Sequence, residues 1–241
     1  MDITLNIWAH FVGVSGEKFQ LHTKEGSEKV KWTLMSNVYP SLTWYKTYFD
    51  TPEGNNTSHV ALRMNNMSKG LHLEKIPNVM ELGIYIECNL VSELQPGSLN
   101  ALPKNLKKLS LYYTYLSPED MAIIGTLPNL EILKLIGYAF SGKEWNTREN
   151  EFCRLKYLQI EKSGLKDWSS AHYFPILECL ILSWCEDLEE FPGSFADNIC
   201  LRLIMLTGYR ISLLSATQIQ EERLSYGDDK VLTVRTAFVL L

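Results

Sequence analysis

The residues best placed to do chemistry lie between Gly137 and Glu144, where GYAFSGKE matches the phosphate-loop pattern G-x-x-x-x-G-K. In such a loop, backbone N–H groups and the lysine hold phosphates, and a following Ser or Thr hydroxyl binds Mg²⁺. Here Glu144 replaces that hydroxyl and would bring a negative charge toward the phosphates. The polar segment EWNTRENE that begins at Glu144 also does not predict the apolar helix that should follow. We therefore interpret this stretch as a connecting loop rather than a nucleotide site.

Other residue types that commonly carry catalysis show no recognisable arrangement. The five histidines form no H-E-x-x-H motif and no cluster with cysteine at zinc-binding spacing, and no G-x-S-x-G motif occurs. The densest carboxylates, at Glu186, Asp187, Glu189 and Glu190, form an acidic run typical of a solvated surface. We therefore predict that the chain is not an enzyme and that it carries no cofactor and no metal.

Composition and charge narrow the class of protein further. The 241 residues are 46% hydrophobic, the net charge is −5 and no basic cluster occurs, which argues against nucleic acid as a partner. The five cysteines are an odd number without a C-x-x-C pair, as expected for reduced thiols. The N-terminus lacks the basic residues of a signal peptide, and no apolar run is long enough to cross a bilayer. We expect a cytoplasmic location and no membrane span.

The strongest regularity in the sequence comes from leucines. The segment Phe174–Pro192 contains L-x-x-L-x-L, which predicts a short strand and a returning chain that cannot bury its apolar face alone. Six copies begin 27, 24, 25, 22 and 24 residues apart, close to the period of leucine-rich repeats. Their apolar positions are Val79/Leu82/Ile84, Leu106/Leu109/Leu111, Leu130/Leu133/Leu135, Leu155/Leu158/Ile160, Leu177/Leu180/Leu182 and Leu201/Ile204/Leu206. The repetition predicts an α/β leucine-rich-repeat solenoid, with a curved parallel sheet on the concave face and short helices and loops on the convex face.

The repeats divide the chain into three parts of one solenoid domain. Residues 77–209 hold about six repeats. Residues 210–241, with a predicted helix at Ala216–Arg223, a turn at Gly227–Asp229 and a closing strand, are expected to form the C-terminal cap. Residues 1–76 are expected to form degenerate repeats or an irregular β segment, with one more repeat strand at Val60–Met64. Because no polar cap precedes this part, we expect the natural protein to continue upstream of Met1.

Local signals predict how the chain returns between strands. Ser117 followed by Pro118, Glu119 and Asp120 is typical of a helix start, with a hydroxyl N-cap, proline in the first turn and acids near the positive end of the dipole. Bulky aromatic residues in the next repeats predict irregular, loop-rich outer segments rather than uniform helices. The residues expected to fill the core there are Phe140, Trp145, Phe152, Leu165, Trp168 and Phe174.

Cys185 follows a repeat strand at the position where many repeats carry asparagine. The equivalent residues in other repeats are Thr114, Tyr138, Ser163 and Tyr209, so no continuous polar ladder is expected. We interpret Cys185 as a buried structural thiol.

The residues between the leucines should point to the concave face, because side chains alternate along a strand. The residues we predict to bind protein there are Lys108, Ser110, Tyr112, Ile132, Lys134, Tyr157, Gln159, Glu161, Cys179, Ile181, Trp184, Leu203 and Met205. In the last two repeats these positions become apolar, so a contiguous apolar patch is expected at Cys179, Ile181, Leu203 and Met205. Either another protein binds this patch, or residues 210–241 fold over it.

From about residue 77 to its end, the sequence resembles the leucine-rich-repeat region of plant intracellular nucleotide-binding, leucine-rich-repeat (NLR) immune receptors, in particular the solanaceous late blight resistance group. The resemblance is carried by LPNLEILKLIGYAFSGKEW (127–145), FCRLKYLQIEKSGLKDW (152–168), FPILECLILSWCEDLEEFP (174–192) and ATQIQEERLSYGDDKVLTV (216–234). It implies a cytoplasmic receptor whose repeats recognise a pathogen effector or a guarded host protein and keep a nucleotide-binding switch off. The sequence contains no coiled-coil or nucleotide-binding domain, so ATP binding would belong to another part of such a receptor.

Two other classes of repeat protein fit the sequence less well. An F-box-type leucine-rich-repeat substrate receptor of a ubiquitin ligase is the alternative, although the first 50 residues lack the leucine- and proline-rich three-helix pattern of an F-box. The ectodomain of a surface receptor would show repeats ending in G-x-I-P and paired capping cysteines, and neither occurs.

Overall fold

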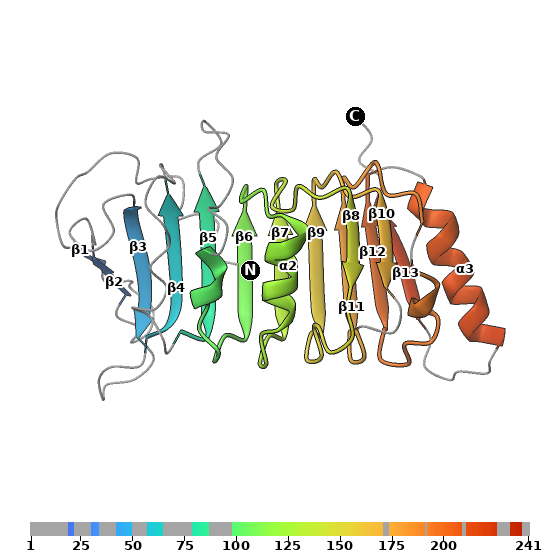
Figure 1. Ribbon diagram of the computed structural model, residues 1–241, viewed down its shortest axis with the longest axis horizontal. Coiled ribbons are helices and arrows are strands. Elements are labelled where there is room, and N and C mark those ends of the chain that lie inside the picture. Colours follow the sequence, from blue (N-terminus) through green and yellow to red (C-terminus); the bar gives the residue numbers. More distant parts are fainter. Residues whose placement is uncertain are drawn as a thin grey trace.

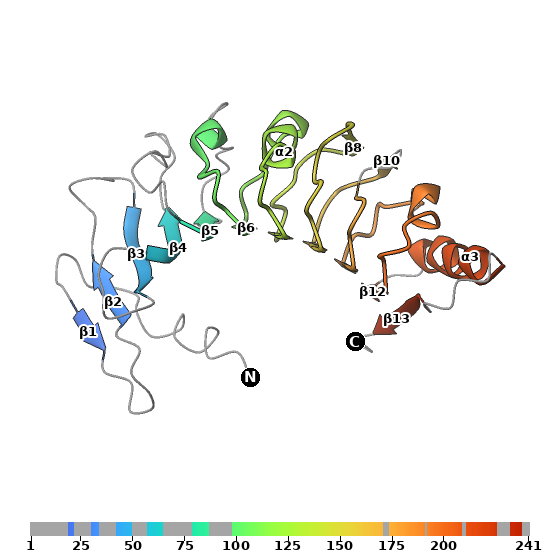
Figure 2. The ribbon, with the colours of Figure 1, turned by 90° about the horizontal axis from the view of Figure 1, so that it is seen from below.

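The computed structural model describes residues 19–21, 30–33, 42–49, 57–64, 79–86, 98–170, 174–190, 192–208, 211–225 and 232–237 of the chain. Within these residues the fold is α/β, with one long, mostly parallel sheet and few helices. The sheet bends into an arc, and its helices and short outer strands lie on the outer side of the bend (Figures 1 and 2).

Eleven strands form the main sheet, in the order β1-β2-β3-β4-β5-β6-β7-β9-β11-β12-β13. The first four, β1 (Phe19–Leu21), β2 (Val30–Thr33), β3 (Leu42–Phe49) and β4 (Thr57–Met64), pair antiparallel with one another. From β4 onward every pairing in this sheet is parallel. The parallel strands are β5 (Glu81–Ile86), β6 (Lys108–Tyr112), β7 (Ile132–Ile136), β9 (Tyr157–Glu161), β11 (Cys179–Ser183), β12 (Leu203–Thr207) and β13 (Thr233–Ala237).

The leucines of the sequence pattern share one register across these strands. Leu109 pairs with Leu133, Leu133 with Leu158, and Leu158 with Leu180. These four side chains are fully buried in one continuous apolar core. In β7, β9, β11 and β12 the residues that alternate with the buried positions are half-buried and face the other way, as period-2 alternation requires. Strand Val60–Met64, expected from the sequence, lies within β4 and pairs Leu62 with Ile84.

Backbone hydrogen bonds at both ends of the strands repeat from one unit to the next. The carbonyl oxygen of Glu131, just before β7, accepts the N–H groups of Lys156 and Tyr157 at 2.8 and 3.0 Å. The residue just after each of the strands β6, β7, β9, β11 and β12 has a positive φ. These residues are Tyr113, Gly137, Lys162, Trp184 and Gly208. Left-handed residues at the same point of five repeats make the chain turn away from the sheet in the same way each time.

On the outer side, helix α2 (Pro118–Gly125) begins as the sequence predicts. Ser117 is its N-cap, and a reciprocal capping box joins Ser117 to Asp120. The pKa of the Glu119 carboxyl is lowered by a backbone hydrogen bond and by its hydrogen bond with Ser117. Short 3₁₀ turns at η2 (Ser98–Ala101) and η3 (Gly193–Phe195) cover other repeats.

The outer segments after β7 and β9 differ from the expected loops. Strands β8 (Glu144–Thr147) and β10 (Asp167–Ser170) form a two-stranded parallel sheet. This sheet arises because the inward aromatic residues stack in register: the Trp145 and Trp168 rings are 5.1 Å apart and nearly parallel. All six residues predicted to fill the core here are buried.

The C-terminal segment adds helix α3 (Ile211–Ser225) on the outer side of the arc and β13 at the end of the sheet (Figure 2). The helix includes the predicted stretch Ala216–Arg223 and is longer than expected. Arg223 is buried, and its guanidinium donates to the carbonyl oxygen of Leu201 in the last L-x-x-L-x-L unit. Gln220 Nε2 donates to the carbonyl oxygen of Leu232 at 2.6 Å. The predicted turn at Gly227–Asp229 lies outside the described residues.

Candidate protein-binding face

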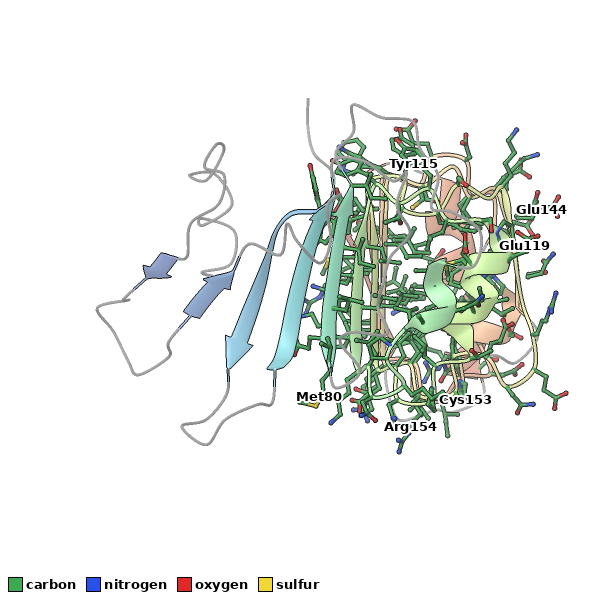
Figure 3. All side chains as sticks on the ribbon, turned by 60° about the vertical axis from the view of Figure 1, so that its left-hand side comes forward. Met80, Tyr115, Glu119, Glu144, Cys153 and Arg154 are labelled. Atoms are coloured by element: carbon green, nitrogen blue, oxygen red, sulfur yellow. The ribbon has the colours of Figure 1, made fainter. Side chains whose placement is uncertain are left out.

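The outward residues of the parallel strands form three columns on the concave side of the sheet. Residues at equivalent positions of successive strands fall in one column, because the strands are in register and about 4.8 Å apart. The structure therefore brings twelve of the thirteen predicted binding residues onto one surface, and Trp184 lies just beyond it, after β11. Figure 3 shows the sheet nearly edge-on, with Glu119 and Glu144 on the opposite, outer side of the molecule.

The early part of this surface, on β5 and β6, is charged and aromatic. Lys108 forms an ion pair with Glu81 at 3.2 Å, and both side chains are about one-third exposed. The Tyr85 ring lies 6.1 Å from the Tyr112 ring and 5.6 Å, edge-on, from the Tyr113 ring. Ser110, a predicted contact residue, is only 8% exposed. Its short side chain lies between the longer side chains of Lys108 and Tyr112 along the strand, so it offers little surface.

In the middle of the surface, on β7 and β9, two polar side chains contact the side chain of one tyrosine. The Lys134 ammonium lies 5.4 Å from the centre of the Tyr157 ring, at cation–π distance. The Tyr157 hydroxyl donates to Gln159 Oε1 at 3.0 Å. Burial raises the pKa of this phenol, and the neighbouring Cys179 adds to the increase. Ile132 pairs in register with Tyr157 and extends the apolar area.

The late part, on β11 and β12, is the predicted apolar patch. Cys179 pairs with Leu203 and Ile181 with Met205, so the four side chains are contiguous. Each is half-buried. Burial raises the pKa of the Cys179 thiol, with a smaller contribution from Glu178. Helix α3 lies on the outer side of the arc and does not cover the patch, and β13 continues the sheet beside it (Figure 2).

The C-terminal ends of the strands carry an aromatic row that the sequence pattern signalled only in part. At the left-handed position, Tyr113 lies against Gly137: a Cβ atom there would come within 2.4 Å of the Tyr113 ring. Trp184 lies in the same way against Gly208, where a Cβ atom would be 3.4 Å from Trp184 Cε3. A ring in one repeat thus covers a glycine in the next. Figure 3 shows Tyr115 at this end of the strands, opposite Met80, Cys153 and Arg154.

The positions equivalent to the expected polar ladder differ from one another. Thr114 is buried and donates to the carbonyl oxygen of Ala139, whereas Tyr138 is half exposed because both Gly137 and Tyr138 are left-handed there. Cys185 Sγ contacts the carbonyl oxygens of Ile160 and Ser183 at 3.7 and 3.6 Å. Burial raises the pKa of the Cys185 thiol to about 11. The side chain is partly buried and packs against the core, so it is less buried than predicted, and its contacts support a structural role. Tyr209 lies outside the described residues.

Sequence reasoning missed Arg235, the outward residue of β13 that pairs with Met205. It was missed because β13 replaces the leucine pattern with TVRTA and was not counted with the repeats. The apolar residues Leu232 and Val234 alternate as on a repeat strand, and Val234 pairs with the inward residue Ile204. This alternation could have indicated that Arg235 points outward.

Two other features, a metal site and a membrane-spanning helix, can be tested against the described part of the chain. No group of three or more His, Cys, Asp or Glu side chains there could hold a metal ion. None of the helices that the structure describes has the length and apolar character needed to span a bilayer.

With this α/β architecture defined, comparison with known proteins gives two groups of relatives, and no protein-family model matches the chain. Beta-galactosidase 14 of Arabidopsis thaliana is 56% identical over 66 residues, which is 27% of this chain and 7% of that protein. The putative late blight resistance protein homolog R1B-13 of Solanum demissum is 36% identical over 178 residues, 63% of this chain and 15% of that protein. A second late blight resistance protein homolog of the same species is 31% identical over 176 residues, 63% of this chain and 14% of that protein.

The chain therefore spans a small part of each relative, and the two groups match it to different extents. The likeness to the late blight resistance homologs covers most of the chain and supports a relationship with this group of plant disease-resistance proteins. The likeness to the Arabidopsis beta-galactosidases is closer in identity but short.

Proposed function

We propose that this chain is a leucine-rich-repeat recognition module of a plant intracellular immune receptor. In this proposal it binds a pathogen effector or a guarded host protein and helps to keep the receptor inactive until then. The observation that carries the proposal is the register of the leucines: the inward positions of β6, β7, β9 and β11 are filled by the core, which leaves the outward columns for contact. The relatives named for late blight resistance supply the biological context of plant defence.

Recognition would occur by surface complementarity and not by chemistry. Apolar and aromatic side chains gather on the outward face, as they do at the centres of protein interfaces. We infer that no cofactor is needed in this chain, because ATP binding and the switch would lie elsewhere in the receptor. The location in this account is the cytoplasm, and the downstream response is the hypersensitive response of plant defence.

The two groups of relatives can be reconciled if they match different parts of the chain. We infer that the resistance likeness lies in residues 77–241 and the beta-galactosidase likeness in residues 1–76, since 63% and 27% fit within one chain without overlap. The change from antiparallel to parallel pairing at β4 supports such a division. The longer match to rice Beta-galactosidase 7, over 49% of the chain, would then extend into the repeats. Comparing residues 1–76 and 77–241 separately with both groups tests this.

We propose that the chain is not a glycosidase, because it spans only 7% to 14% of the beta-galactosidases it matches. The purified chain should release no product from a chromogenic β-galactoside. Turnover that persists through purification and is lost on denaturation would overturn this part of the proposal.

Affinity capture from infected and healthy leaf extracts tests the recognition role. Three versions of the chain are compared: wild type, the double variant Ile181→Glu/Met205→Glu, and Lys143→Glu on the outer side as a control. We expect wild type and the control to enrich the same protein and the double variant to lose it. Equal enrichment by all three folded proteins would contradict the proposed binding face.

Autoinhibition has a separate test. Co-expression of the chain with a constitutively active nucleotide-binding portion of such a receptor should reduce leaf cell death. Unchanged cell death with the chain present at equal abundance would remove autoinhibition from the proposal while leaving partner recognition standing.

A further inference from the structure

The middle outward column of the late sheet has an ordered chemical sequence. From β7 to β13 it reads Lys134, Gln159, Ile181, Met205 and Arg235, each residue pairing in register with the next. Two cations therefore bracket an apolar centre. With adjacent strands about 4.8 Å apart, the two bracketing positions are roughly 19 Å apart across the sheet.

Charge on this part of the face comes from few side chains, and two of the three are cationic. Among the outward residues of β7, β9, β11, β12 and β13 that the structure describes, the charged side chains are Lys134, Arg235 and Glu161. Glu161 lies in another column, at the C-terminal end of β9. Lys134 is positioned over the Tyr157 ring, and Arg235 is exposed. The chain as a whole is acidic, with a net charge of −5, so this local bias toward cations runs against its overall charge.

The face of a sheet sets a condition on what can bind it. The backbone N–H and C=O groups of these strands are already paired with neighbouring strands, so the face offers side chains only. An extended segment lying on it would leave its own backbone groups unpaired where water is excluded. A helix satisfies its backbone internally and presents an apolar stripe to a concave surface.

We propose that this late face binds an amphipathic helix of a partner protein whose apolar stripe is flanked at both ends by acidic side chains. This inference rests on the proposed recognition function and specifies the partner chemistry of the same face. The stripe covers Ile181, Met205, Cys179 and Leu203, and the acidic residues meet Lys134 and Arg235. At a rise of 1.5 Å and a turn of about 100° per residue, acids about 11 or about 14 residues apart lie on one side of a helix. They are then separated by roughly 17 or 21 Å, which matches the roughly 19 Å between the two cations.

Three synthetic helices of about 18 residues serve as probes for the full chain by fluorescence anisotropy. The first carries a leucine stripe with glutamates spaced as above, the second has lysines in place of those glutamates, and the third keeps the glutamates but replaces the leucines with glutamine. We expect the first to bind at least about tenfold more tightly than either of the others, since it alone combines apolar burial with opposite charge.

Charge reversal in the protein gives the matched test. Arg235→Glu should remove the preference for the glutamate probe over the lysine probe, whereas Lys143→Glu on the outer side should leave it unchanged. Circular dichroism confirms that each variant is folded. Equal binding of the glutamate and lysine probes, or no binding of the glutamate probe to the folded wild-type chain, would overturn the inference.

The outcomes separate this inference from the proposed function. If leaf capture depends on Ile181 and Met205 but the probes show no charge preference, the function stands and the acidic helix is wrong. If the glutamate probe binds as expected but no leaf protein is captured, the face has the stated chemistry and the immune role fails.

Discussion

The early and late halves of the parallel sheet share a core-facing side and differ on the concave face. Inside, Leu82 and Leu109 continue into Leu158 and Leu180 without a change in residue type or burial. On the concave face, an ion pair and tyrosines on β5 and β6 give way to aliphatic and sulfur side chains on β11 and β12. Alternate residues of the same strands thus carry two separable tasks, folding and contact. Changes on one face should affect one task and spare the other.

The largest expected effect is a contrast between two isoleucines. Ile160 on β9 is 1% exposed and faces the core, and Ile181 on β11 is half-buried on the concave face. Ile160→Ala should lower the free energy of unfolding by about 2–5 kcal/mol, as expected for a cavity in a packed core. Ile181→Ala should cost about 1 kcal/mol or less, because water already reaches part of its side chain. Urea denaturation measures both, and equal losses would contradict the separation of faces.

The second effect tests the turn at the C-terminal ends of the strands. Gly137 has φ +64, and a Cβ atom there would collide with the Tyr113 ring. Gly137→Ala should cost about 2–4 kcal/mol, combining the left-handed backbone with overpacking. Gly193→Ala is the control, since nothing lies within 4 Å of a Cβ there. The double variant Gly137→Ala/Tyr113→Ala should recover the overpacking part only, and full recovery would show that the backbone conformation costs nothing.

The third effect depends on pH and compares Cys185 with exposed Cys153. The pKa of the Cys185 thiol is about 11 in the folded chain, above the ordinary value of 9.0. The unfolded chain therefore releases this proton first, so the thiol's contribution is present below pH 9 and is lost as the pH rises through 11. Wild type should lose about 3 kcal/mol more than Cys185→Ala over this range. Cys153→Ala should behave like wild type, and a matching loss in the Cys185→Ala protein would refute the assignment.

The smallest effect concerns the ion pair of the early half. Lys108 and Glu81 are each 36% exposed, so solvent screens their 3.2 Å contact. A double-mutant cycle with Lys108→Met and Glu81→Gln should give a coupling of about 0–1 kcal/mol that disappears at high salt. A larger coupling that resists salt would mean that charge pairing, and not only the leucine core, holds the early repeats together.

The sequence predicted the parts of this fold that repeat. The spacing of leucines identified the strands and their common register, and the Ser117–Asp120 signal located a helix start. The outer strands β8 and β10 were not foreseen, because they arise from stacking between Trp145 and Trp168, residues 23 positions apart whose contact no local pattern encodes. The columns of the binding face followed from alternation alone, whereas the low exposure of Ser110 depends on the lengths of its neighbours. Whether the predicted C-terminal helix covers the patch could be decided only from the position of α3.

Oxidation of the methionines by dilute peroxide tests the central claim most directly. Met80 is 38% exposed, Met121 is fully buried on the outer side of the sheet, and Met205 lies half-buried on the proposed contact patch. If the outward face of the late sheet is open as described, mass spectrometry should show Met205 oxidising at a rate near that of Met80 and well before Met121. Protection of Met205 equal to that of Met121 in the isolated, folded chain would mean that this face is covered, and the proposed contact surface would be wrong.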